Sequence, residues 1–202
     1  MVYDFNQTCK TYDKTFYTRA YFEFTPCPAC PAVGRFSLHG SYERNIIYFD
    51  DGEIVCRLME IKRVKCASCK ATHAVMPGDI IPYKILSLFV FVHILVSFFL
   101  EKASVLKMAG AWDFSFQFIY SVIHAFHRHA NNIRQYIREV SCELAPSAID
   151  ACGILDFITN KSGAGFQAGY TRLNRRPCFM GKFFCRAGAP PIGIYSQPRL
   201  AT

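Results

Sequence analysis

The sequence predicts an α+β fold, in which a β-rich part is followed by a helical part and an irregular basic tail. Short, alternating apolar runs broken by glycines fill residues 25–76. From Ile85 the apolar spacing changes to a helical period. After Pro146 glycines and prolines crowd the chain without a clear period. We therefore expect four segments, at residues 1–24, 25–80, 81–145 and 146–202.

The composition excludes several classes of protein. The chain has 202 residues, of which 51% are apolar and 19% charged, as in a folded chain of one or two compact units. Extensive disorder is excluded, and the absence of internal repeats excludes a solenoid. The formal net charge is +8, and residues 151–202 carry 7 Lys/Arg against 1 Asp/Glu. A basic protein of this kind suggests an anionic partner, either nucleic acid or a membrane surface.

The β-rich part predicts a hairpin. Residues 1–24 form an N-terminal extension with many aromatic residues, which can add a strand or two. Asp50-Asp51-Gly52 is a turn signal, preceded by the apolar run 45–49. The stretch after the turn, residues 53–66, nearly alternates between apolar and polar residues. The hairpin therefore lies between two pairs of cysteines.

These cysteine pairs predict a metal site. The chain has 10 cysteines, and two CxxC motifs are separated by 35 residues. Two CxxC turns bring four thiolates around one tetrahedral ion, which leaves no open coordination position. We therefore expect one structural Zn²⁺ in a zinc ribbon, with metal binding stabilising a segment too small to fold by apolar burial alone. The predicted ligands are Cys27, Cys30, Cys66 and Cys69.

Two alternatives bear on this site. One CxxC could be a redox dithiol, but Pro26 and Pro28 and the lack of a βαβ pattern disfavour this. His39 and His73 lie near the cysteines, but four thiolates fill the coordination shell, so we expect packed or hydrogen-bonding histidines. Asp4 stands where a secretory signal has basic residues, which favours a reducing, cytoplasmic location.

Basic side chains along the hairpin are candidates for nucleic-acid contact. A positive stripe on a strand suits phosphate binding, although an ordinary solvated strand face explains it almost equally well. The candidates are Arg44, Arg57, Lys62, Arg63, Lys65 and Lys70.

The helical part predicts three helices. The first, Ile85–Leu100, has 16 residues without a formal charge. A bilayer needs about 20 such residues, and His93 adds a cost, so we expect a buried helix rather than a membrane anchor. Two further helices, at 101–110 and from 115 to about 137, have helix-turn-helix spacing. The last of them has an apolar stripe, and its opposite face could reach base edges. The residues of that face are Ser115, Gln117, Phe118, Ser121, His124 and Arg128.

Several runs carry a resemblance to a family. CPAC, HGSYERNI, IKRVKCASCKATHAVMPGDIIPYK and DFSFQFIYSV, within residues 25–130, resemble bacterial mobile-element proteins of unassigned function. These are related to the zinc-ribbon and helix-turn-helix front ends of insertion-sequence transposases. The resemblance implies zinc on the four cysteines and a recognition helix. It implies that the recognition helix carries Ser115, Gln117, Tyr120 and Ser121. The sequence departs from the family at Phe116 and Phe118, where small polar residues are usual.

No enzyme activity is expected. Metal-dependent strand cleavage needs several carboxylates on a folded sheet. Beyond residue 130 the carboxylates cluster within a short stretch that has no strand pattern, at Glu139, Glu143, Asp150 and Asp156. The sequence also lacks GxxxxGK[ST], HExxH and GxSxG motifs.

The leading hypothesis is a zinc-dependent protein that binds double-stranded DNA, with a separate transposase or another protein subunit as a second partner. The basic tail would add sequence-independent attraction through Arg172, Arg175, Arg176, Lys182 and Arg186. Three alternatives stay open: a zinc-ribbon module that docks on a protein, a membrane-associated zinc protein anchored through residues 80–100, and binding of RNA in place of DNA.

Overall fold

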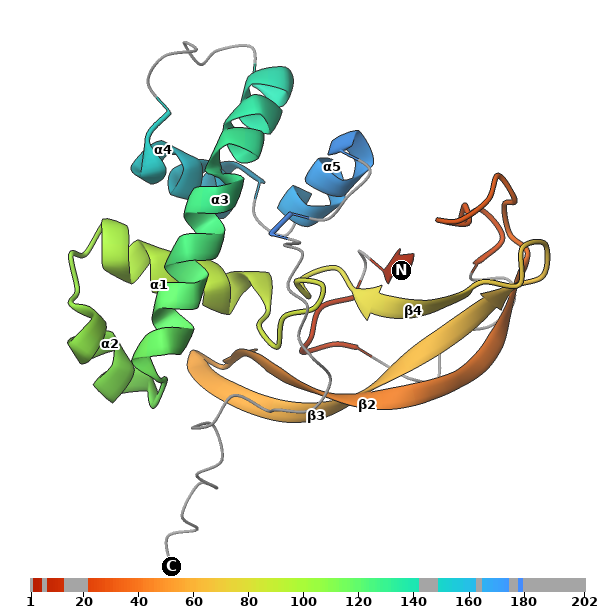
Figure 1. The fold of residues 1–202 in the computed structure, drawn as a ribbon, viewed down its shortest axis with the longest axis horizontal. Helices are drawn as coiled ribbons and strands as arrows, with labels where there is room; N and C mark the ends of the chain where they lie inside the picture. The colour runs from red at the N-terminus through yellow and green to blue at the C-terminus, as the bar shows by residue number, and fades with distance from the viewer. Residues whose placement is uncertain are drawn as a thin grey trace, which may run out of the picture. The chain divides into compact units, whose positions relative to one another are not determined.

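The computed structural model describes residues 2–4, 7–12, 22–141, 149–162, 165–174 and 178–179. The chain divides into two compact units, Met1–Phe89 and Val90–Thr202. The first contains a β-sheet and the second contains helices (Figure 1). The predicted α+β class is therefore confirmed.

A long two-stranded hairpin, which we call the ribbon, dominates the first unit. Strand β2 (Phe36–Asp50) pairs antiparallel with β3 (Glu53–Cys66) along nearly its whole length. Asp51 and Gly52 connect the strands with φ values of 49° and 90°. Positive φ at both central residues matches the right-handed twist of a two-residue hairpin turn. The predicted turn and hairpin are both confirmed.

Two shorter strands complete the sheet, whose strand order is β1-β4-β3-β2. Strand β4 (Thr72–Pro77) runs antiparallel to β3, and β1 (Val2–Asp4) runs parallel to β4. The N-terminal extension thus supplies one strand, in line with the prediction. Strand β2 is left at the edge of the sheet (Figure 1).

The pairing of β2 with β3 contains one irregularity. Leu38 pairs with Val64 and Ser41 with Lys62, so β2 has one extra residue in this interval. Gly40, inside the interval, has a φ of 91°. Such a bulge bends the strand locally and increases its twist.

Both faces of the sheet carry apolar clusters. Val64 and Ile61 are an odd number of residues apart on β3, so their side chains project to opposite faces. Each belongs to a separate buried cluster. One cluster, next to the cysteines, contains Val2, Phe22, Cys27, Phe36, Val64, Cys66 and Val75. The other contains Cys9, Ile46, Tyr48, Met59, Ile61, Met76 and Ile80.

A buried loop at residues 78–87, which we call the strap, crosses the edge of the ribbon. Ile47 on β2 donates its N–H to Ile85 O at 2.6 Å and accepts the N–H of Ser87 at 2.8 Å. Within the strap, Asp79 Oδ1 accepts the backbone N–H of Cys9 at 2.8 Å. Burial raises the pKa of the Asp79 carboxyl. The strap therefore links the N-terminal segment to strand β2.

The Tyr12 hydroxyl joins β3 and β4 beyond the end of their ladder. It donates to Val75 O at 2.9 Å and accepts the N–H of Lys62 at 3.2 Å. Tyr12→Phe leaves both backbone groups without this partner, so we expect it to lower the free energy of unfolding by about 1–3 kcal/mol. Urea unfolding measures the change. Tyr83→Phe, at an exposed tyrosine of the same unit, is the control and is expected to be neutral. An equal effect of the two substitutions would contradict the prediction.

Three helices begin the second part of the chain, close to the predicted ranges. They are α1 (Leu88–Phe99), α2 (Val105–Trp112) and α3 (Phe116–Val140). The predicted apolar stripe of α3 is buried, at Ile119, Val122, Ile123 and Phe126. Among the described residues, no helix combines the length and the apolar character needed to cross a membrane.

The prediction of an irregular tail from residue 146 onwards is wrong for residues 151–162 and 165–174. These residues form α4 (Ala151–Asp156), the π-helix η2 (Phe157–Ser162) and α5 (Gly165–Asn174). Asp150 caps α4, since its Oδ1 accepts the N–H of Gly153 at 2.8 Å. Apolar side chains on these short helices are buried, namely Ile154, Leu155, Phe157, Ile158 and Phe166. Tertiary packing thus outweighs the weak helical signal of a glycine-rich sequence.

Candidate metal centre and candidate nucleic-acid interface

The two CxxC motifs fold into similar loops. In the first loop, the N–H of Cys27 donates to Ala32 O at 2.8 Å; in the second, the N–H of Cys66 donates to Ala71 O at 2.9 Å. The same six-residue closure thus occurs twice. The N–H of Ala67 also donates to Arg35 O at 2.7 Å, which ties the second loop to the chain that leaves the first.

Gly34 fixes the approach to the first loop. Its φ is 68°, and its N–H donates to Thr25 O at 3.0 Å. A Cβ atom at this position would lie 2.3 Å from the backbone oxygen of Glu23. Only glycine therefore allows this close approach of the two backbones.

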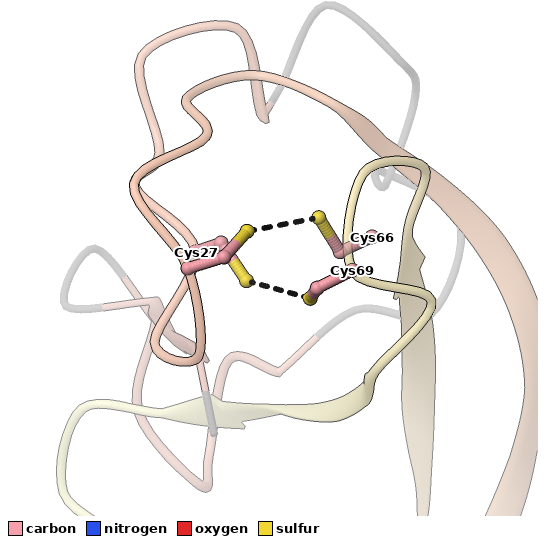
Figure 2. A group of neighbouring side chains, drawn as sticks. Cys27, Cys66 and Cys69 are labelled. Carbon is pink, nitrogen blue, oxygen red and sulfur yellow. Dashed lines mark hydrogen bonds between the residues drawn. The ribbon is translucent and has the colours of Figure 1, made fainter.

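These loops bring the four cysteines together, and Figure 2 shows Cys27 on one side of the site and Cys66 and Cys69 on the other. The Sγ atoms all lie within 4.8 Å of one another. Cys27 Sγ lies 3.7 Å from Cys69 Sγ, and Cys30 Sγ lies 3.8 Å from Cys66 Sγ. Metal–sulfur bonds of about 2.3 Å in a tetrahedron place sulfurs about 3.8 Å apart. The donor set therefore fits a tetrahedral metal ion, and the four cysteines could hold one.

Hydrogen bonds, burial and neighbouring thiols give two of the cysteines different pKa values. The backbone N–H of Cys69, assisted by that of Ser68, lowers the pKa of Cys66 to about 6. The backbone N–H of Ala32 acts in the same direction on Cys30, but burial and the neighbouring thiols outweigh it and raise its pKa to about 11. A metal ion would displace the remaining protons, because only thiolates bind it strongly.

The His73 side chain lies against this cluster, whereas His39 is exposed on β2. His73 is on β4, its Nε2 is 3.4 Å from Cys27 Sγ, and its side chain is buried. Its ring packs edge-on against Phe36, with centroids 6.1 Å apart. Burial lowers the pKa of His73, which favours the neutral ring. His73 is thus packed beside the cysteines, within hydrogen-bond distance of Cys27 Sγ.

The basic candidates on the ribbon do not form one surface. Arg44 donates from its guanidinium to the carbonyl of Lys84 in the strap. Lys62 Nζ is 2.9 Å from Glu60 Oε1, and Glu43 lies opposite Glu60 in the register. By strand alternation, Arg57, Arg63 and Lys65 project to the face opposite to that of Lys62. Lys70 lies in the second cysteine loop with a φ of 63°.

The predicted contact residues of α3 divide into two groups, one engaged within the protein and one exposed. Ser115 is the N-cap, and its Oγ accepts the N–H of Phe118 at 3.2 Å. Ser121 Oγ donates to Phe118 O at 2.7 Å. Both hydroxyls therefore form hydrogen bonds with the backbone of α3 itself. Phe118 is half-buried against Phe114, with ring centroids 4.8 Å apart.

The remaining candidates are exposed. Together with Phe116 and His127, which were not among the predicted contact residues, they form what we call the α3 face. Helical spacing places these residues on one side of the first turns of α3, opposite the buried stripe. The α3 face consists of Phe116, Gln117, Tyr120, His124, His127 and Arg128.

Comparison with known proteins finds a similarity over part of the chain. Residues 27–103 match the family model of DUF6431, a domain of unknown function. The matched segment begins at Cys27 and ends just before Ser104, the N-cap of α2. It thus contains all four cysteines, the ribbon and α1, and it excludes α2 and α3. No curated protein and no solved structure matches the chain.

The basic residues of the tail are less fully described. Arg172 lies in α5, and only the backbone is described at this position. The others, Arg175, Arg176, Lys182 and Arg186, lie outside the described residues.

Proposed function

We propose that this chain is a zinc-dependent protein that binds double-stranded DNA through α3. The observation that carries the proposal is the α3 face, which combines an amide, two histidines, two aromatic rings and a guanidinium. From Phe116 to Arg138 the helix has no acidic residue, so it would not repel phosphates. Gln117 and Arg128 are residue types that contact base edges and phosphates.

The connection between α2 and α3 supports a helix-turn-helix. The two helices are separated only by Asp113, Phe114 and Ser115. Asp113 has a φ of 53°, the conformation for which glycine is frequent in such turns. Buried Phe114 anchors the turn. In this arrangement α3 is the helix that would enter a major groove, with its N-terminal turns near the bases.

The metal in the proposal is one structural Zn²⁺ on Cys27, Cys30, Cys66 and Cys69. Four thiolates at tetrahedral spacing favour zinc and leave no position for a substrate. Bound zinc would supply folding free energy to a small sheet, and the backbone donors around the sulfurs would stabilise the thiolates. This part of the chain would then be a zinc ribbon.

The transposase-like class rests on the sequence resemblance. The chain would recognise DNA without cutting it, because no set of carboxylates for two metal ions is evident in its sequence. A separate protein would then carry out any strand transfer.

The second candidate function is docking on another protein. It is favoured by exposed apolar side chains on the same two helices: Leu106 is 71% exposed, Phe116 46% and Tyr120 49%. Aromatic residues at exposed positions are typical of protein interfaces as well as of nucleic-acid interfaces. DNA binding is preferred because the α3 face also carries a positive charge and no negative one.

The test selects duplexes from a random pool and measures their affinity by fluorescence anisotropy at several salt concentrations. Gln117→Ala should weaken binding to the selected duplex by about 5- to 150-fold, the equivalent of about 1–3 kcal/mol for a lost base contact. Arg128→Ala should weaken binding to all duplexes and reduce the salt slope by about one.

Lys161→Ala is the charge-matched control, since Lys161 is an exposed cation outside α3. It should leave the affinity for the selected duplex nearly unchanged. Failure to select any duplex at micromolar protein, or affinity that does not depend on salt, would overturn the proposal. If no duplex is selected and Leu106→Ala abolishes binding of this chain to a partner protein, the docking function would be supported instead.

A further inference from the structure

We infer that His73 is a positioning residue of the metal centre. The Nε2–H of His73 donates a hydrogen bond to the Cys27 sulfur, and this bond stabilises and orients that one thiolate ligand. The inference rests on the proposed zinc site and extends it beyond the four cysteines. It assigns the site a side-chain partner from β4, a strand that supplies none of the ligands.

Geometry supports a donor role rather than coordination. His73 Nε2 is 3.4 Å from Cys27 Sγ, within the range of a hydrogen bond to sulfur. The set of atoms that lie within 4.8 Å of one another contains the four sulfurs and excludes this nitrogen. The four thiolates already complete a tetrahedron. His73 therefore lies beside the coordination shell and contacts a single ligand.

The surroundings hold the ring in this position. His73 is 8% exposed, and Phe36 packs edge-on against its ring. Val64, which is also buried, is its partner across the β3–β4 ladder. A side chain fixed by strand pairing and ring packing can orient a hydrogen bond with little loss of entropy.

His73 gives Cys27 a side-chain donor, in addition to backbone donors of the kind that two of the other cysteines also have. The Cys27 sulfur also accepts the backbone N–H of Ala29 at 3.4 Å, so two donors point at it. Hydrogen bonds withdraw electron density from a thiolate and stabilise it. The metal centre is therefore asymmetric, since Cys27 and Cys66 are buried whereas Cys69 is exposed.

The experiment compares His73→Phe with His73→Gln in the full-length chain. Phenylalanine keeps the ring packing and removes the donor, and glutamine keeps a side-chain N–H. Each protein is titrated with Co²⁺ and Zn²⁺, and the sulfur-to-cobalt charge-transfer band is recorded. His73→Phe should weaken metal affinity about 10- to 100-fold, because the Cys27 thiolate loses the donor that stabilises and orients it. It should also move the band to lower energy, because the thiolate becomes richer in electrons. His73→Gln should retain most of the metal affinity and a band close to that of the wild type.

His39→Phe is the matched control, at an exposed histidine of the same sheet. It should change neither the affinity nor the band. If His73→Phe fails to fold, His73→Met replaces it, since methionine matches glutamine in length and has no N–H donor. The inference would be overturned if the variant without a donor kept the wild-type band and the wild-type metal affinity. It would also be overturned if His73→Gln bound metal as weakly as the variant without a donor. Wild-type protein that forms no tetrahedral Co²⁺ or Zn²⁺ complex would instead overturn the proposed zinc site.

Discussion

A Cys69→Ser protein is expected to lose its bound metal ion and the ordered cysteine-bearing end of the ribbon. Serine is a poor ligand for zinc, and three thiolates cannot close the tetrahedron. Structural zinc sites have apparent binding free energies of about 10–16 kcal/mol, much of which is folding free energy. Removal of one ligand therefore affects the sheet as a whole. Cys69 is exposed, so this substitution disturbs the core less than one at buried Cys66.

Metal content by atomic spectroscopy and thermal unfolding by circular dichroism measure these effects. Cys56→Ser is the matched control, because Cys56 is an exposed cysteine of β3 outside the cluster. It should keep one equivalent of zinc and unfold like the wild type. A Cys69→Ser protein with a full equivalent of metal and unchanged unfolding would show that the four sulfurs do not form a structural site.

Gly34→Ala is expected to destabilise the first unit by at least about 3 kcal/mol. Two costs add: the left-handed backbone disfavours any residue with a Cβ, by about 1–2 kcal/mol, and the new atom would overlap the backbone oxygen of Glu23. A backbone atom cannot rotate away as a side chain can. The backbone would have to shift instead, which would displace the segment that leads to Cys27 and weaken metal binding.

Gly40→Ala separates the two costs. Gly40 also has a positive φ, of 91°, but a Cβ there would meet nothing within 4 Å. It should show only the backbone cost, about 1–2 kcal/mol, and retain full zinc affinity. Urea unfolding and zinc competition measure both variants. Equal losses at the two glycines would contradict the steric explanation for Gly34.

The hairpin and the cysteine pairs could be predicted because their signals are local. Asp51-Gly52 sets a two-residue turn by backbone preference alone, and each CxxC loop closes within six residues. The helices from residue 88 to residue 140 were also predicted, since their apolar spacing is regular and Ser104 and Ser115 cap α2 and α3. Their boundaries differ from the predicted ones by a few residues.

Other features depend on contacts between residues far apart in the chain. Arg44 appears in the sequence as a free cation, but its guanidinium binds the carbonyl of Lys84, 40 residues away. The hydrogen bond from the Cys9 N–H to Asp79 Oδ1 joins residues that are 70 positions apart. The helices after residue 150 are too short for their own apolar period to be evident, and burial of Ile154 and Phe166 stabilises them. No local pattern contains this information.

The bulge in β2 has a consequence for how the molecule behaves at high concentration. An edge strand with free N–H and C=O groups can recruit a second chain and start aggregation. The extra residue between Leu38 and Ser41 interrupts the regular spacing of those groups, and its added twist prevents a flat approach. The bulge therefore makes the part of the β2 edge that the strap leaves uncovered a poor template for fibre growth.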